Sequence, residues 1–277
     1  MPPTEYAARQ PLTEKGEAPV AVLVTGFGPF LAKFPINSSW EIASNLPALI
    51  PVTSLNKTPI HIRVHHEAIR VAYKSVVDLV PTLLPPQNPA YQPPDIILHI
   101  GLAAGRSFFA IENGSSRDVY DKIPDVDGER FSQEATAAKF PKEKFPSFLT
   151  TSFNTSDVLA RWKAQLGFSS PDGDAVIEGC PDVRISQDAG NFMCGFIYYN
   201  SLAHYFSIKE GEKPVVFLHV PDLSGSADKL REGREVTIAL IKALVESRRE
   251  LGVVDTPENT ETGKKTDGAL QTDNNFS

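Results

Sequence analysis

Cysteine is scarce in this chain of 277 residues, which contains only Cys180 and Cys194. Two cysteines are too few for the disulfide framework that holds many small secreted proteins together. The sequence has no Cys-x-x-Cys pair, and its histidines stand apart from both cysteines, so it offers no set of zinc ligands. We therefore expect neither a disulfide scaffold nor a metal site.

The chain also has no excess of basic residues. The chain has 27 Lys and Arg against 34 Asp and Glu, a net charge of −7, and no polybasic block. Nucleic acids and anionic membranes attract positive charge, so we expect neither as a partner. No apolar run is long enough to cross a membrane, and the first residues lack the basic stretch and apolar core of a secretory signal. These absences predict a cytoplasmic protein.

The composition between the ends suits one α/β domain. Hydrophobic residues make up 41% of the chain and charged residues 22%, which is ordinary for a globular protein. Residues 1–18 and 255–277 are polar or rich in proline, and they cannot bury enough apolar surface to offset their ordering entropy. We therefore predict two disordered tails around a single domain, residues 19–254.

Apolar runs typical of buried strands alternate along this domain with segments of helical spacing. Strands are expected at residues 20–27, 60–66, 95–103, 108–112, 182–186 and 214–221, and helices at 38–46, 67–80, 156–168, from about Cys194 onward, and at 227–251. Residues 81–94 hold six prolines and are expected to form a loop, while 113–153 are polar with turn signals. The alternation predicts an open, mostly parallel sheet covered by helices on both faces.

Three notable places lie where predicted strands end. They are the turn GFGPF at residues 26–30, Glu112 and His219. Open α/β sheets bind ligands beyond the carboxyl ends of their strands, so we expect a site where these places meet. Phe27 and Phe30 flank Pro29 in the turn and suit either a small apolar pocket or ordinary core packing.

Cys194 is the best candidate for a nucleophile. It stands where a strand gives way to a helix, and the positive end of a helix dipole favours a thiolate. Gly190 permits a tight turn before it, and the first amides of the helix can bind an oxyanion. The alternative is an inert buried cysteine. Cys180 sits in a turn with no helix after it, and we interpret it as structural.

His219 and Glu112 would complete a hydrolytic group. A histidine at the tip of a strand could take the proton of the Cys194 thiol, and a carboxylate at Glu112 could orient the imidazole. The alternatives are a core histidine bonded to backbone and a surface glutamate. His204 stands ten residues after Cys194, which is about 15 Å along a helix and too far to serve as the base.

Taken together, these residues resemble the pyroglutamyl peptidase I, or pyrrolidone carboxyl peptidase, family of cysteine peptidases. The blocks that carry the resemblance, in matching order and spacing over residues 20–250, are VTGFGPF with INSSW, HIGLAAGRSFFAIE, and ISQDAGNFMCGFIYYNSL followed by FLHVP. The stretch near 130–180 matches poorly. The family implies an α/β/α sandwich with a mostly parallel, partly mixed sheet, no cofactor, and hydrolysis of an N-terminal 5-oxoproline from peptides.

The resemblance also implies residue roles. The nucleophile falls on Cys194, the base on His219 and the third member on Glu112. The pocket for the lactam ring falls on Phe27, Phe30, Ile123, Phe192 and Met193. Lys122 stands at the position of a bacterial arginine and could support the oxyanion, although an ammonium lacks the two-pronged geometry of a guanidinium.

The chain also departs from the family pattern near these residues. Leu102 replaces a bacterial glutamine, Asn113 follows Glu112 where a basic residue is usual, and Gly195 follows Cys194 where Asp or Asn is usual. Two other readings therefore stay open. One is a non-catalytic protein that kept the pocket, and the other is a thiol amidase acting on another small lactam or acyl group. The sequence also leaves open whether the chain forms a homo-oligomer.

Overall fold

The computed structural model describes residues 18–53, 56–85, 93–168, 180–208 and 212–252. Nine strands and six helices occur in this part of the chain, in an order that alternates as the sequence pattern predicts. They are β1 (Val20–Gly26), α1 (Ser38–Ser44), β2 (Leu49–Ile50), β3 (Ile60–Val64), α2 (Tyr73–Leu83), β4 (Ile96–Leu102), β5 (Phe109–Glu112), β6 (Gly114–Ser116), α3 (Gln133–Lys139), β7 (Phe148–Thr150), α4 (Thr155–Gln165), β8 (Val183–Ser186), α5 (Met193–Ser207), β9 (Val215–Val220) and α6 (Ala227–Leu251).

Seven strands form the central sheet, in the order β2-β3-β1-β4-β9-β5-β8. Strands β3, β1, β4 and β9 pair in parallel, while β2 pairs antiparallel with β3 and β5 pairs antiparallel with β9. Strand β8 runs parallel to β5. The sheet is therefore mixed but mostly parallel, as expected. A separate pair, β6 and β7, forms a small antiparallel sheet.

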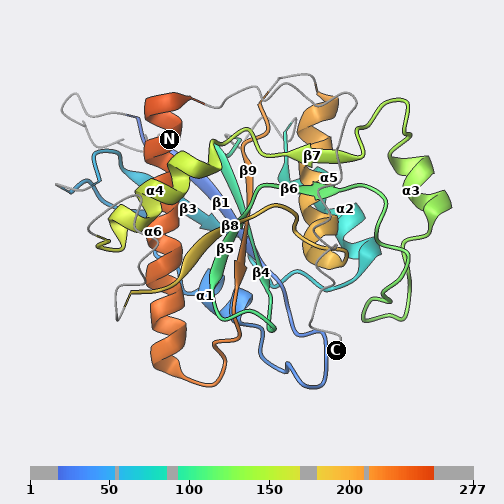
Figure 1. Cartoon of the computed structure of the whole chain (residues 1–277), viewed down its shortest axis with the longest axis horizontal. Coiled ribbons are helices and arrows are strands. Elements are labelled where there is room, and N and C mark those ends of the chain that lie inside the picture. The colour runs from blue at the N-terminus through green and yellow to red at the C-terminus, as the bar shows by residue number, and fades with distance from the viewer. Residues whose placement is uncertain (1–17, 54–55, 86–92, 169–179, 209–211, 253–277) are drawn as a thin grey trace, which may run out of the picture.

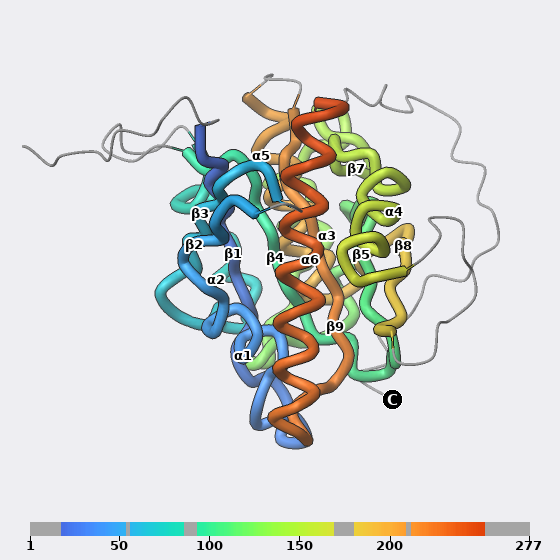
Figure 2. Tube along the Cα trace, turned by 90° about the vertical axis from the view of Figure 1, so that its left-hand side faces the viewer, coloured from blue at the N-terminus to red at the C-terminus, as the bar shows by residue number. Residues whose placement is uncertain are grey.

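Helices cover both faces of the central sheet. Helices α1, α4 and α6 pack on one face, and α2 and α5 pack on the other, so the sheet lies between two helical layers (Figure 1). Viewed from the side of the first layer, α6 and α4 lie in front of the strands (Figure 2). The expected three-layer α/β/α architecture is confirmed. None of the helices in the described ranges is both long and apolar enough to span a membrane.

Side-chain caps explain where several helices begin. Asn37 accepts a hydrogen bond from Ser39 N at the start of α1, and Ser226 accepts one from Asp228 N at the start of α6. Helix α5 has no side-chain cap, and its N-cap residue is Phe192. The beginning of α5 is therefore held by its surroundings rather than by its own sequence.

Helix α2 differs from its prediction at both ends. It begins at Tyr73 rather than at residue 67, because Ile69 forms a bridge with Phe27 at the end of β1. It continues to Leu83 and contains Pro81, so the expectation of a loop from residue 81 is wrong for its first three positions. A proline near the end of a helix removes only one late hydrogen bond, which tertiary packing can outweigh.

The polar stretch 113–153 is more structured than expected. It contains β6, α3 and β7, which the sequence pattern did not predict. Both strands have three residues, too few to produce a recognisable alternation. The two tails predicted at the ends lie almost wholly outside the described residues, so that expectation stays a prediction.

A buried histidine lies near the middle of the sheet. His99 on β4 is fully buried, with Nδ1 2.7 Å from Thr25 Oγ1 and Nε2 2.9 Å from Ser201 Oγ. Both ring nitrogens are thus satisfied in the neutral form, and burial lowers the pKa of His99 to about 3. His99 lies within the strand predicted at residues 95–103, and its contacts join β1, β4 and α5.

His99 should make the fold sensitive to acid. In the unfolded chain the ring binds a proton below about pH 6.5, whereas in the folded chain it stays neutral down to about pH 3. As the pH falls through this window, the free energy of unfolding should therefore drop by up to about 1.4 kcal/mol per pH unit. Urea unfolding at a series of pH values measures this slope. The slope should be shallower in His99→Gln than in the wild type. Equal slopes in the two proteins would show that His99 is not the source of the acid sensitivity.

Candidate active site

The carboxylate of Glu112 and the imidazole of His219 form a buried pair. Glu112 Oε1 lies 2.6 Å from His219 Nδ1, and their side chains are 0% and 5% exposed. Arg106 Nη1 donates to the same oxygen at 2.9 Å. The other oxygen, Oε2, is buried and has no hydrogen-bond partner in the described structure. The arrangement fixes Nδ1 toward the acid and leaves Nε2 to act on another group.

Strand direction brings Glu112 to His219 in an unexpected way. Strand β5 is antiparallel to β9, with Ala110 opposite His219 and Glu112 opposite Phe217. The carboxyl end of β5 therefore does not lie at the same edge as that of β9. Glu112 reaches His219 along the shared face of two antiparallel strands. The expected proximity is confirmed, but the reason given from strand ends is wrong for this residue.

Cys194 lies over the sheet beside His219. A Cβ atom added to Gly101 on β4 would lie 2.7 Å from Cys194 Sγ and 2.5 Å from the ring of Phe217. Gly101 is the register partner of His219 in the parallel pair β4–β9. Register partners on adjacent strands are about 4.8 Å apart and present side chains on the same face. The thiol and the imidazole therefore occupy neighbouring positions on the α5 face.

The turn before α5 delivers Cys194 to this position. Gly190 has φ +88°, a conformation that glycine adopts without strain, and its N–H donates to Asp188 Oδ1 at 3.0 Å. Ser115 Oγ donates to Gly195 O at 2.8 Å and so ties β6 to the first turn of α5. Backbone N–H groups at the start of a helix point outward from its N-terminus, next to the thiol.

Asp188 adds negative charge beside the pair. Burial raises the pKa of Asp188, and the hydrogen bond from Ser116 Oγ, at 2.7 Å, opposes this rise. The charge of Glu112 raises this pKa further, while His219 lowers it. The pair is thus surrounded by both signs of charge, and Arg106 is the cation that contacts Glu112 directly.

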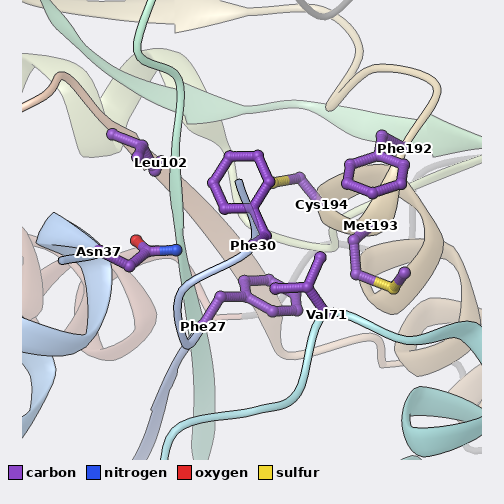
Figure 3. Close-up of a pocket in the computed structure, with 8 residues that line it drawn as sticks. All are labelled: Phe27, Phe30, Asn37, Val71, Leu102, Phe192, Met193 and Cys194. Carbon is purple, nitrogen blue, oxygen red and sulfur yellow. The ribbon is translucent and has the colours of Figure 1, made fainter. Parts of the chain in front are cut away.

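An apolar pocket opens next to Cys194. It contains about 260 Å³ of empty space, part of it open to solvent. Its walls come from the segment between β1 and α1, from the segment before α2, from the end of β4 and from the start of α5. The lining residues are Phe27, Phe30, Asn37, Val71, Leu102, Phe192, Met193 and Cys194. Figure 3 shows the sulfur of Cys194 directed into the space between these side chains.

Aromatic packing shapes the pocket. The rings of Phe30 and Phe192 lie 6.5 Å apart, and Phe30 stacks on Phe34 at 5.6 Å. Tyr73 at the start of α2 supports Phe192 edge-on from behind. Phe27, Phe192 and Met193 are buried, whereas Phe30 is half-buried.

Two predicted site residues lie outside the lining of the pocket. Ile123 is half-buried and packs against the apolar cluster that contains Phe192, and its carbonyl accepts a hydrogen bond from Tyr73 Oη at 2.9 Å. Lys122 is exposed on the same loop, and its carbonyl accepts from Arg130 Nε at 3.2 Å. Their roles in substrate and oxyanion binding stay predictions. Cys180 does not form a disulfide with Cys194.

Sequence reasoning assigned no role to several residues of this site. Asn37, the N-cap of α1, is also a polar side chain in the pocket wall, with its amide nitrogen toward the space (Figure 3). That nitrogen donates to Gly28 O at 2.8 Å and carries a second N–H. Gly101 and Arg106 stand in the block HIGLAAGRS and carry no signal of their own. No metal-binding group of three His, Cys, Asp or Glu occurs in the described ranges.

Comparison with known proteins identifies relatives of this chain and structures with a similar fold. A family model for pyroglutamyl peptidase matches residues 20–149, a stretch that ends before Cys194 and His219. Pyroglutamyl-peptidase 1 of Mus musculus is 27% identical over 86% of this chain and 93% of its own length. Pyrrolidone-carboxylate peptidase of Pyrococcus furiosus is 26% identical over 81% of this chain and 96% of its own. The solved structure of a mutant pyrrolidone carboxyl peptidase from the same hyperthermophile covers 84% of this chain and all of that one, with a TM-score of 0.58 and 26% identity.

The close approach of Cys194 to the sheet predicts that Gly101 accepts no larger residue. We expect Gly101→Ala to lower the free energy of unfolding by about 1–3 kcal/mol, because the new methyl overlaps Sγ and the Phe217 ring. The displaced thiol should also react several-fold more slowly with iodoacetamide. Gly225→Ala is the control, since nothing lies within 4 Å of the added atom there. A Gly101→Ala protein as stable and as reactive as the wild type would rule out the contact.

Proposed function

Because this chain belongs to the pyroglutamyl peptidase family, we propose that it is a cysteine omega peptidase that removes an N-terminal 5-oxoproline residue from peptides. The observation that carries the proposal is the set formed by Cys194, His219 and Glu112. The thiol lies above the register partner of His219, and the imidazole is hydrogen-bonded to a fully buried carboxylate.

Each of the three side chains has a step in the reaction. His219 Nε2 takes the proton of Cys194, and the thiolate attacks the carbonyl carbon of the peptide bond that follows 5-oxoproline. The imidazolium then gives this proton to the leaving amine as the C–N bond breaks, which leaves a thioester. His219 next takes a proton from water, the hydroxide cleaves the thioester, and the thiolate is regenerated. Glu112 holds the imidazole in the required tautomer throughout.

The backbone at the start of α5 supports the negative charge that develops on the carbonyl oxygen. First-turn N–H groups are fixed donors, and the helix dipole adds to their effect. The N-cap residue of α5 is Phe192, whose side chain makes no capping hydrogen bond to these donors. The exposed ammonium of Lys122 is a second candidate donor to this oxygen.

The pocket fits the chemistry of 5-oxoproline. This residue is a flat, uncharged ring, and aromatic walls can enclose it and exclude water. The lactam offers one carbonyl and one N–H, and the second N–H of Asn37 is a suitable donor for the carbonyl. A free N-terminal amine would enter an apolar slot as an unpaired charge, which costs several kcal/mol. Peptides with an ordinary N-terminus should therefore be rejected.

One feature of the pocket favours a second candidate. Leu102 adds an apolar wall where the bacterial relatives carry a glutamine, and Asn37 is then the polar side chain left in the lining. A thiol amidase that removes another small lactam or acyl group would use the same three catalytic residues. Fluorogenic amides of 5-oxoproline, proline, alanine and acetylated glycine, assayed side by side, distinguish the two candidates from each other and from a protein that only binds.

The three catalytic assignments predict unequal losses of activity. Cys194→Ala and His219→Ala should each lower kcat on a pyroglutamyl amide by about 10⁴-fold or more, and Glu112→Gln by roughly tenfold less, because proton transfer is indispensable and orientation is not. Cys180→Ser and His65→Ala, which change residues outside the site, should retain wild-type kinetics. Turnover by His219→Ala at the wild-type rate would remove the histidine from the mechanism.

Recognition of the lactam should depend on Phe30. We expect Phe30→Ala to lower kcat/KM for pyroglutamyl amides by about ten- to hundredfold, because the pocket loses an aromatic wall. The ratio of kcat/KM for pyroglutamyl amides to kcat/KM for prolyl amides should fall as well. Phe148→Ala is the matched control, since Phe148 lies on β7, away from the pocket. Unchanged discrimination in both Phe30→Ala and Phe27→Ala would place recognition elsewhere.

A further inference from the structure

We propose that Arg106 is a positioning residue that acts through Glu112 and keeps His219 in the tautomer that can accept a proton. This inference rests on the proposed function, because it concerns the same site. Arg106 Nη1 donates to Glu112 Oε1 at 2.9 Å, and His219 Nδ1 lies 2.6 Å from that oxygen. One carboxylate oxygen thus joins the guanidinium and the imidazole.

The turn after β4 positions Arg106 for this contact. Arg106 N donates to Ala103 O at 2.9 Å, which closes the turn, and the Arg106 side chain is only 16% exposed. Its guanidinium also lies 5.7 Å from the centre of the Phe108 ring. Cation–π contact and the ion pair together restrict the guanidinium, so its geometry is fixed before any substrate binds.

The burial of Glu112 makes a cation necessary. A fully buried carboxylate loses its hydration, and this loss favours the protonated form unless opposite charge or hydrogen bonds compensate. Oε2 has no hydrogen-bond partner among the described residues, and Asp188 nearby adds negative charge. Tyr198 Oη donates to the backbone carbonyl of Glu112, at 3.1 Å, and not to its carboxylate. The compensation therefore comes from Arg106.

The protonation state of Glu112 decides what His219 can do. An ionised Glu112 accepts a hydrogen bond from Nδ1–H, and the neutral imidazole then has Nε2 unprotonated and ready to accept the thiol proton. A protonated Glu112 would instead donate to Nδ1, and the ring proton would move to Nε2, where it blocks general-base action. The groups that face the pair in the described structure are Arg106, Asp188, Cys194 and Tyr198.

The kinetic test uses Arg106→Met and Arg106→Lys. At neutral pH we expect Arg106→Met to lower kcat on a pyroglutamyl amide by about ten- to hundredfold with KM unchanged, and Arg106→Lys to lose less because it keeps a charge. The acid limb of the kcat/KM profile should move to higher pH in Arg106→Met. Guanidinium ion, added below denaturing concentrations, should restore part of its activity. An unshifted acid limb would overturn the proposal.

A double variant tests whether Arg106 acts through Glu112. Once Glu112→Gln has removed the carboxylate, adding Arg106→Met should lower kcat little further. The fold-losses of kcat in the two single variants should therefore not multiply in the double variant. Losses that do multiply would give Arg106 a separate role. Arg184→Met is the matched control, since Arg184 packs on the same Phe108 ring, at 4.2 Å, and makes its ion pair with Asp182 at the surface. It should retain wild-type kinetics.

Alkylation of Cys194 tests the role of Arg106 independently of the proposed peptidase activity. The rate of iodoacetamide labelling against pH reports deprotonation of the thiol by His219 and needs no substrate. In folded Arg106→Met, verified by circular dichroism, the labelling profile should shift to higher pH by the same amount as the kinetic one. If the wild type cleaves no pyroglutamyl amide but this shift is present, the assignment of Arg106 stands and the substrate is wrong. A labelling profile identical to the wild type would refute the role of Arg106.

Discussion

The hydrogen bond between Glu112 and His219 is the interaction on which the rest of the site depends. It joins two antiparallel strands in the interior, where both side chains are almost fully buried. A buried carboxylate is tolerated only with a cation and an imidazole beside it, which ties the turn that carries Arg106 to the edge of β5. The mixed direction of the sheet is thus part of the site, because a parallel β5 would carry Glu112 to a different edge.

The close approach of helix α5 to the sheet is the second constraint. Cys194 Sγ occupies the space that a side chain at position 101 would fill, and Phe217 closes the same space from the next strand. His99, two residues earlier on β4, bonds Ser201 on α5 and holds the helix to that face. The thiol is therefore positioned by packing between rigid elements. This is how an active site keeps its geometry without a bound substrate.

The sequence predicted the architecture well and the site in part. Long apolar strands and capped helices have strong local signals, so β1, β4, β9 and α6 lie where the pattern places them. The three-residue strands β6 and β7 have no such signal and depend on tertiary pairing. Likewise the contact of Arg106 with Glu112 cannot be inferred from spacing, because the direction of β5 decides it and local sequence does not encode strand direction.

The departures from the family pattern become intelligible at Gly195. A Cβ atom there would lie 2.1 Å from Gly190 O and 3.1 Å from Ser115 Oγ, so this turn has closed onto the helix and leaves no room for a side chain. The hydrogen bond from Ser115 to Gly195 O fixes the same turn from the other side. A glycine at position 195 therefore allows the turn at Gly190 to pack directly against the first turn of α5. This packing fixes the first turn of α5 and, with it, the backbone that carries the Cys194 thiol.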